Sequence, residues 1–204
     1  MLTKSKLAIT LSKLKTFENP DLQSEQYATD SESAALILWN AFMNGDVEGK
    51  AIADFGAGTG ILGIGCLLLG AKSVYFVERD REALAVAEQN LAAVKEKING
   101  NYELMLRDVR NAEVKADVII QNPPFGTKTA HADREFLLQA FEAAPVVYSF
   151  HKTATALFVE RLAAARGFSV TNRYGLSLPL KQQHSFHKRK IHRVEVSCFR
   201  MERT

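Results

Sequence analysis

The chain has 204 residues, of which 47% are hydrophobic and 24% are charged, a balance typical of a globular protein with a buried core. Its formal net charge of +3 is small, no apolar run approaches the ~20 residues of a membrane span, and the N-terminus lacks the pattern of a secretion signal. These features argue against a membrane or secreted protein, so we expect a cytoplasmic protein with a single domain over residues 1–204.

Two helices open the chain, separated by a polar loop. Leucines spaced at helical intervals predict an amphipathic helix over residues 3–15. Thr29 and Glu32 have the spacing of a capping box, which predicts a second helix that ends near Gly45. We expect these elements to form an N-terminal arm and covering loop over residues 1–48.

Strands and helices alternate over the remaining residues, 49–204. The predicted strands lie at residues 50–56, 73–78, 102–108, 116–122, 146–151, 168–178 and 192–201, and the predicted helices at 59–70, 81–98, 133–144 and 154–167. This alternation predicts an α/β protein with a mostly parallel sheet and helices on both faces. The last two strands have no helix between them, so they form a hairpin that adds an antiparallel strand. Seven strands in this order match a Rossmann-like class I S-adenosylmethionine methyltransferase better than a dinucleotide-binding protein.

A glycine-rich turn, ADFGAGTGILG, joins the first core strand to its helix. Gly56, Gly58 and Gly60 permit a tight turn and let a ligand approach the main chain closely. Their G-x-G-x-G spacing differs from the G-x-G-x-x-G of dinucleotide sites. Asp54, beside the turn, suits the cationic amino-acid end of S-adenosylmethionine and repels a pyrophosphate. This turn therefore favours S-adenosylmethionine over a nicotinamide cofactor.

Two further carboxylates follow neighbouring strands. Glu78 ends the second core strand and can accept both hydrogen bonds of a ribose diol. Asp108 closes the third core strand, where it either accepts from the adenine amino group or caps the following turn. Together with Asp54 they outline a nucleoside-binding site.

The sequence QNPPFG ends the fourth core strand at a stiff elbow. Asn122 is expected to face the methyl group of the cofactor, because ligands of such sheets lie at the carboxyl ends of the strands near the switch point. Its side-chain carbonyl and the Pro123 carbonyl are two fixed acceptors for an –NH2 group, and Pro124 stiffens the loop. Phe125 offers a face on which a planar group can stack. The elbow predicts methylation of a conjugated amine, and on its own it equally describes a rigid turn with a packed Phe.

Several motifs together resemble those of a known family, the archaeal and eukaryotic methyltransferase-like proteins that place N6-methyladenosine in small-subunit ribosomal RNA. The resemblance covers nearly the whole chain and is carried by EQYAT (25–29), ADFGAGTGILGIG, ERDREAL, RDV, QNPPFGTK, VYSFHK and SFHKRK. It implies a catalytic tetrapeptide of Asn122, Pro123, Pro124 and Phe125. It also implies a cofactor site formed by Gln26, Tyr27, Thr29, Gly56, Thr59, Glu78, Asp108, Val109 and Asn122.

The resemblance also implies two macromolecular partners. The first is RNA, and the second is a small zinc-ribbon activator subunit that adds a strand to the sheet edge. The strand at 102–108 is the candidate surface for this activator.

A basic stretch near the C-terminus supports RNA binding. No Asp or Glu occurs between Arg161 and Val194, which suits a phosphate backbone and equally suits a solvated face. We expect phosphate contacts from five residues of the connection before the last strand: Lys181, His187, Lys188, Arg189 and Lys190. His151 and Lys152 end the fifth core strand, where they line the RNA channel, unless His151 is a structural histidine. Without nearby acids the histidines predict no metal site, and the distant Cys66 and Cys198 are expected to be buried thiols.

Three alternatives stay open at this stage. The amine can belong to guanine N2, a DNA base or a protein glutamine, although the basic stretch favours nucleic acid. The chain can also be a non-catalytic RNA-binding module, although such a module has no need for the complete NPPF motif with Asp54 and Glu78. A nicotinamide dehydrogenase is the least favoured.

Overall fold

The strand–helix alternation of the sequence is present in a computed structural model, which describes residues 2–16, 29–124, 132–180 and 192–204. The helices are α1 (Lys4–Leu11), α2 (Ser31–Met43), α3 (Ile61–Leu68), α4 (Arg81–Val94), α5 (Ala132–Ala143) and α6 (Ala156–Ala165). Short 3₁₀ turns are η1 (Lys95–Lys97), η2 (Val109–Asn111) and η3 (Thr153–Thr155). The strands are β1 (Ala51–Phe55), β2 (Ser73–Glu78), β3 (Asn101–Leu106), β4 (Val118–Gln121), β5 (Val146–Lys152), β6 (Phe168–Leu180) and β7 (His192–Arg203).

All seven strands join one sheet in the order β3-β2-β1-β4-β5-β7-β6. Neighbouring pairs from β3 to β5 are parallel, whereas β7 runs antiparallel to both β5 and β6. The predicted seven-stranded sheet with an antiparallel last strand is therefore confirmed. The chain reverses its direction across the sheet between β1 and β4, and this switch point is where ligands of such sheets bind.

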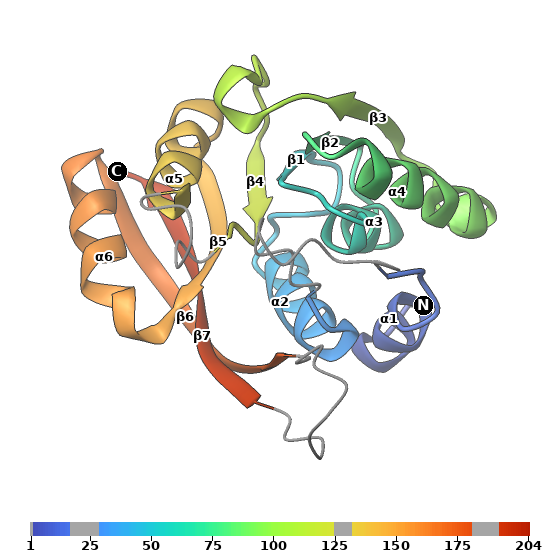
Figure 1. Cartoon of the computed structure of the whole chain (residues 1–204), viewed down its shortest axis with the longest axis horizontal. Coiled ribbons are helices and arrows are strands. Elements are labelled where there is room, and N and C mark those ends of the chain that lie inside the picture. Colours follow the sequence, from blue (N-terminus) through green and yellow to red (C-terminus); the bar gives the residue numbers. More distant parts are fainter. Residues whose placement is uncertain (1, 17–28, 125–131, 181–191) are drawn as a thin grey trace, which may run out of the picture.

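Helices cover both faces of the sheet, as Figure 1 shows. One apolar cluster joins α1, α2, α3 and α4 to the sheet through residues such as Ile52, Phe76 and Ile120. A second cluster joins α5 and α6 to the opposite face through residues such as Phe55 and Ile119. Because side chains alternate along a strand, Asn122 leaves β4 toward the first face and Gln121 toward the second. Assignment of the whole chain to one domain stays a prediction.

The N-terminal cap of α2 differs from the predicted one. Asp30 is the cap, and its Oδ1 accepts a hydrogen bond of 3.0 Å from the backbone N–H of Ser33. The capping box of Thr29 and Glu32 was wrong by one residue, because two adjacent residues of the cap-forming type compete for the same position. Thr29 is thereby left to bind elsewhere.

A buried ion pair ties the end of the arm to the sheet. Arg200 of β7 donates from Nε to Oδ2 of Asp46 over 2.7 Å, and the Tyr148 hydroxyl donates to the same oxygen over 2.6 Å. Breaking such a pair leaves one charge buried without a partner, so it fixes the arm firmly against the sheet.

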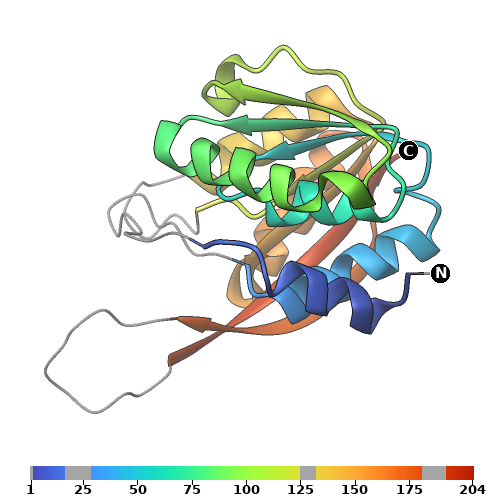
Figure 2. The same cartoon turned by 90° about the vertical axis from the view of Figure 1, so that its right-hand side faces the viewer.

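The β6–β7 hairpin extends beyond the other strands, as Figure 2 shows. Pairing between β5 and β7 stops at Lys152 opposite Val196, whereas β6 and β7 stay paired as far as Leu180 opposite His192. This two-stranded extension lies at the same edge as the carboxyl ends of the parallel strands. It leads into residues 181–191, which hold most of the predicted phosphate contacts and lie outside the described residues.

Candidate active site

The switch point brings together residues from three neighbouring strands. Asp54 lies in β1, Glu78 ends β2, and Asn122 directly follows β4. The pairing of Asp54 with Phe76 and with Ile120 places the three strand ends side by side. The residues singled out from the sequence as nucleoside ligands and as catalytic elbow thus meet at one edge of the sheet.

The glycine-rich turn between β1 and α3 has a backbone that only glycine adopts readily. Gly56, Gly58 and Gly60 have φ values of 69°, 55° and 85°, which lie in the left-handed region that disfavours other residues. The turn is fixed to β2, because the N–H groups of Gly56 and Ala57 both donate to the Val77 carbonyl, over 2.9 and 3.1 Å. The main chain is therefore held bare and rigid where a ligand can approach it.

Asp54 of β1 carries a buried carboxyl that contacts the first turn of α3. Its side chain is 1% exposed, and Oδ2 accepts a hydrogen bond of 2.8 Å from the Gly63 N–H. Burial raises the pKa of Asp54 from 3.8 to about 7, the Gly63 bond opposes this rise, and the charge of Glu78 adds to it. A cation bound here would favour the charged form, so the site suits a positively charged ligand.

Glu78 accepts three backbone hydrogen bonds and holds the glycine turn. Its Oε2 accepts from Gly58 over 2.8 Å, and Oε1 accepts from Arg79 and Asp80 over 2.8 and 2.9 Å. A carboxylate offers about four acceptor positions, so this conformation leaves room for one further donor, on Oε2. One acceptor position is thus left for the predicted ribose diol while the Gly58 bond is intact, and the contact of Glu78 with a ribose stays a prediction.

Asp108 has the environment of the alternative role, that of a cap. Its Oδ1 accepts from the backbone N–H and Nε of Arg110, each over 2.9 Å, and Oδ2 accepts from Nη2 over 2.9 Å. The hydrogen bond of the Arg110 side chain lowers the pKa of Asp108, so the group is a carboxylate. Val109, the next residue, is buried. A role for both residues at an adenine ring stays a prediction.

Among the described residues, Asn122 has a hydrogen-bond partner for its amide nitrogen but none for its amide oxygen. Its Nδ2 donates over 3.0 Å to Oγ1 of Thr29, the residue left free by the cap of α2. Its Oδ1 is buried and accepts no hydrogen bond from any residue within the described ranges. A buried acceptor without a donor is costly, so such a group in a native site calls for a ligand or water that supplies the donor. The orientation leaves the carbonyl oxygen for that donor.

Asn90 of α4 was not predicted from the sequence, although it braces the glycine turn. It is 2% exposed, its Nδ2 donates to the carbonyl of Thr59 over 2.9 Å, and it exchanges two hydrogen bonds with the backbone of Lys15. Asn90 thereby links the glycine-rich turn to the segment that follows α1. A polar residue on the apolar side of a predicted helix was the available signal.

His151 differs from the predicted RNA contact. Its ring is 1% exposed, and Nε2 lies 2.7 Å from Oγ of Ser149. Burial lowers the pKa of His151 to about 3, so the ring is neutral at physiological pH. The structure corrects the channel-lining role, because this side chain points into the protein; the alternative of a structural histidine describes its surroundings. Ser149 in turn accepts from Nε2 of Gln121 over 3.0 Å.

The remaining predicted residues divide into two groups. Pro123 is buried, Pro124 is half-buried, Thr59 is buried, and Lys152 ends β5 at the predicted edge. The other group lies outside the described residues and comprises Gln26, Tyr27, Phe125, Lys181, His187, Lys188, Arg189 and Lys190.

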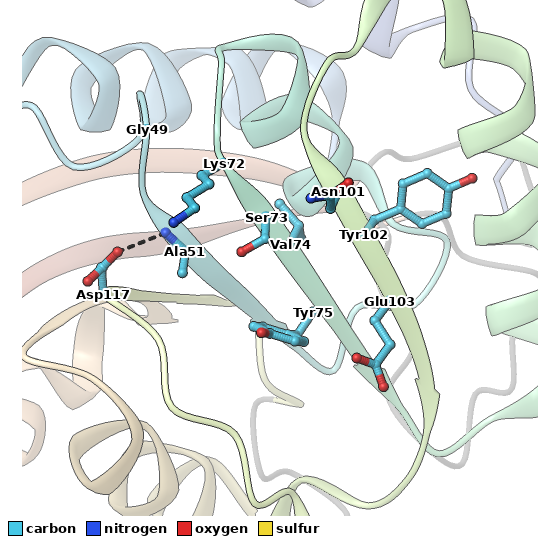
Figure 3. Close-up of a pocket in the computed structure, with 10 residues that line it drawn as sticks. All are labelled: Gly49, Ala51, Lys72, Ser73, Val74, Tyr75, Asn101, Tyr102, Glu103 and Asp117. Atoms are coloured by element: carbon cyan, nitrogen blue, oxygen red, sulfur yellow. Dashed lines mark hydrogen bonds between the residues drawn. The ribbon is translucent and has the colours of Figure 1, made fainter.

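The structure also contains a shallow cavity of about 470 Å³ on the sheet face of β1, β2 and β3 (Figure 3). Its lining includes Ala51, Ser73 and Asn101, the first residues of these strands. The cavity therefore lies at the opposite ends of the strands from Asp54 and Asn122, and we assign it no part in the site.

Other kinds of site are not seen in the described ranges. Within residues 2–16, 29–124, 132–180 and 192–204, no group of three His, Cys, Asp or Glu is arranged to hold a metal ion. In that same part of the chain, no helix is both long and apolar enough to cross a bilayer. Cys66 and Cys198 are buried free thiols, as predicted.

Known proteins resemble this chain in sequence and in structure. The family model for the methyltransferase small domain matches residues 23–148. The rRNA N(6)-adenosine-methyltransferase of Drosophila melanogaster is 34% identical and aligns over 91% of this chain and 90% of its own length. The crystal structure of a candidate RNA methyltransferase from Pyrococcus horikoshii is 44% identical, covers 98% of both chains and has a TM-score of 0.89. The magnesium protoporphyrin IX methyltransferase of Synechocystis with bound SAM shares the fold at 16% identity, with a TM-score of 0.67 over 85% of this chain and 79% of its own.

Proposed function

Because the chain belongs to the methyltransferase small domain family, we propose that it transfers a methyl group from S-adenosylmethionine to N6 of adenine in RNA, in particular small-subunit ribosomal RNA. The resemblance inferred from the sequence motifs is confirmed by the relative from Drosophila melanogaster, which is named an rRNA N(6)-adenosine-methyltransferase and matches the chain nearly end to end. The predicted class I methyltransferase fold is likewise confirmed.

One observation carries the proposal, the buried Oδ1 of Asn122 at the switch point, which accepts no hydrogen bond from the part of the chain that the structure describes. An exocyclic amine has two N–H donors, and the Asn122 carbonyl oxygen supplies an acceptor for one of them. The backbone carbonyl of Pro123 supplies the second acceptor in this proposal. Two fixed acceptors turn the lone pair of the amine nitrogen in one direction, and such orientation alone accelerates a reaction strongly.

The residues around the glycine turn fit the proposed cofactor. When bound, S-adenosylmethionine supplies an electrophilic methyl group on a sulfonium cation. The carboxyl of Asp54 and the carboxylate of Glu78 provide negative charge on either side of the bare turn, and Oε2 of Glu78 has room for a hydroxyl donor. Asp54 would lose its proton to meet a cation, since its pKa lies near 7 without one.

The enzyme needs no strong base at the amine. The amine nitrogen would attack the methyl carbon with its lone pair as the sulfur–methyl bond breaks and the sulfonium leaves as a neutral thioether, and the cationic nitrogen would then release a proton to water. Asn122 and Pro123 are neutral acceptors and thus stabilise the positive charge that develops on the amine hydrogens. Phe125 is proposed to stack on the adenine ring, as enzymes that extrude a base require.

Incubation of the protein with methyl-labelled S-adenosylmethionine and small-subunit ribosomal RNA, followed by nucleoside chromatography, tests this function. We expect the label in N6-methyladenosine. Label in N2-methylguanosine, or in a protein glutamine with none in RNA, would identify another amine as the substrate. Binding of RNA without any methyl transfer would contradict the enzymatic function.

We further propose that a small zinc-ribbon activator pairs with β3. This strand is an edge of the sheet, and Tyr102 and Leu106 on it are 42% and 45% exposed. An open edge with apolar side chains invites an added strand. Hydrogen exchange measured with and without a co-expressed zinc-ribbon protein tests this proposal. We expect slower exchange of the β3 amides in the complex, and unchanged β3 exchange would exclude this edge.

A further inference from the structure

Three buried polar side chains form a hydrogen-bond network next to the catalytic elbow. Gln121 and Ser149 are 0% exposed and His151 is 1% exposed. The Gln121 amide donates to Ser149 over 3.0 Å, and the Ser149 hydroxyl lies 2.7 Å from Nε2 of His151. Polar groups in a sheet core destabilise a fold unless they are hydrogen-bonded. The presence of this network in the core therefore calls for an explanation other than packing.

The position of Gln121 suggests that reason. It is the last residue of β4, and the next residue is Asn122. Side chains alternate along a strand, so Gln121 is held on the α5–α6 face while Asn122 is held by Thr29 on the α2 face. The backbone between them is consequently fastened from both faces of the sheet at the point where it leaves the ladder.

His151, at the other end of this network, is itself firmly packed. The His151 ring packs edge-on against Phe199, with 6.1 Å between ring centroids. Ser149 and His151 both lie within β5, which pairs with β4 on one side and β7 on the other. His151 stays neutral over the physiological range because it is buried, and its Nε2 pairs with Ser149 Oγ as acceptor or as donor according to the tautomer.

We propose that Gln121, Ser149 and His151 are positioning residues that fix the direction of the Asn122 carbonyl and the Pro123 carbonyl toward the amine. None of the three touches the reacting atoms. Loss of the Ser149 hydroxyl leaves the Gln121 amide without its acceptor and lets the elbow turn. This inference rests on the proposed role of Asn122 in methyl transfer.

A matched pair of serine variants tests the proposal. Ser149→Ala removes the middle member of the Gln121–Ser149–His151 hydrogen-bond network. Ser197→Ala removes an equally buried serine of the neighbouring β7, and this serine is hydrogen-bonded to Thr153 and Arg173. Both variants lose buried hydrogen bonds, so thermal unfolding is expected to show similar stability costs. We expect Ser149→Ala to lower kcat roughly tenfold, with the KM for S-adenosylmethionine within about twofold of the unmodified protein, because small misplacement at a reacting centre is costly. Ser197→Ala is expected to keep kcat within about twofold.

A second readout needs no substrate. The Asn122 side-chain NH2 signals are assigned in ¹⁵N spectra of the full chain by their loss in Asn122→Ala. We expect these signals to shift in Ser149→Ala and to stay in place in Ser197→Ala. If Ser149→Ala fails to fold, His151→Phe keeps the ring packing on Phe199 while removing the hydrogen-bond partner of Ser149, and the same shift is expected. Unmoved Asn122 signals in the folded variants, or equal kcat in both serine variants, would overturn the positioning role. Failure of the wild-type protein to methylate RNA would instead contradict the proposed function and leave the spectroscopic test intact.

Discussion

Asn122 directly follows β4, and its Nδ2 donates over 3.0 Å to Thr29, which precedes α2. The N-P-P-F run marked the residue because two prolines stop a strand by known backbone geometry. Its partner Thr29 lies 93 positions away in sequence, and no local pattern connects the two. Asn90, Gln121 and Ser149 were missed for the same reason, since their hydrogen-bond partners come from other segments. The position of Asn122 at the end of a strand was therefore predictable, but the contacts that support it were not.

Asp54 offers a test at the scale of one residue. Its pKa is raised from 3.8 to about 7 in the folded protein. Between those values the folded state keeps a proton that the unfolded chain has lost, so stability falls as pH rises through this window. Asp54→Asn removes that loss, which amounts to about 4 kcal/mol at most from roughly 1.4 kcal/mol per pKa unit. We expect the variant to gain stability over the unmodified protein at pH 8 and much less at pH 4, as measured by urea unfolding.

Asp54→Asn is expected to lower the affinity for the cofactor although it raises the stability of the fold. Removing the carboxylate should weaken binding of S-adenosylmethionine, measured by calorimetry, and affinity of the unmodified protein should rise with pH through 7 as Asp54 loses its proton. A stability gain that is equal at pH 4 and pH 8 would show that folding leaves the pKa of Asp54 unchanged.

At the scale of elements, strand and helix types followed from periodicity, while ends and caps did not. The predicted strand at residues 168–178 extends to Leu180 as β6, because β7 continues to pair with it beyond the edge of β5. The cap of α2 moved from Thr29 to Asp30. Such ends depend on neighbouring segments, which local propensity does not describe.

The close packing of α3 on β2 gives a prediction at this scale. A Cβ added at Gly63 would lie 2.4 Å from Cε1 of Phe76, a ring that is fully buried. Gly63→Ala should destabilise the protein by about 1–3 kcal/mol through overpacking, despite the higher helix propensity of alanine. Gly175→Ala is the control, because no atom of the described residues lies within 4 Å of an added Cβ there. Equal denaturation midpoints for the two variants would contradict this packing account.

At the scale of the whole molecule, the fold class was predictable because right-handed strand–helix–strand units restrict a parallel sheet to few arrangements. The sequence also indicated a basic stretch. The strands that flank it, β6 and β7, extend on the side of the sheet where the parallel strands end and where Asn122 lies. Which basic side chains meet RNA did not follow, since His151 proved to be buried. Charge along a chain indicates a phosphate partner and says little about individual contacts.

RNA binding gives the prediction at this scale. Replacing Lys188 and Lys190 by alanine should reduce RNA affinity and make its dependence on salt shallower, by about 0.7–0.9 in the logarithmic slope per lost phosphate contact. Lys95→Ala with Lys97→Ala removes the same charge from η1, an exposed turn after α4. Filter binding over a range of salt concentrations should separate the two double variants. Identical slopes would mean that net charge alone, and no particular contact, governs binding.

The most direct test of the account measures methyl transfer by Asn122→Ala on small-subunit ribosomal RNA, together with its affinity for S-adenosylmethionine. Loss of the Asn122 carbonyl removes the buried acceptor proposed for the amine, while Asp54, Glu78 and the glycine turn are untouched. We expect methyl transfer to fall by at least about 100-fold, with the cofactor affinity largely kept. Full transfer activity in Asn122→Ala would contradict the central role of this carbonyl.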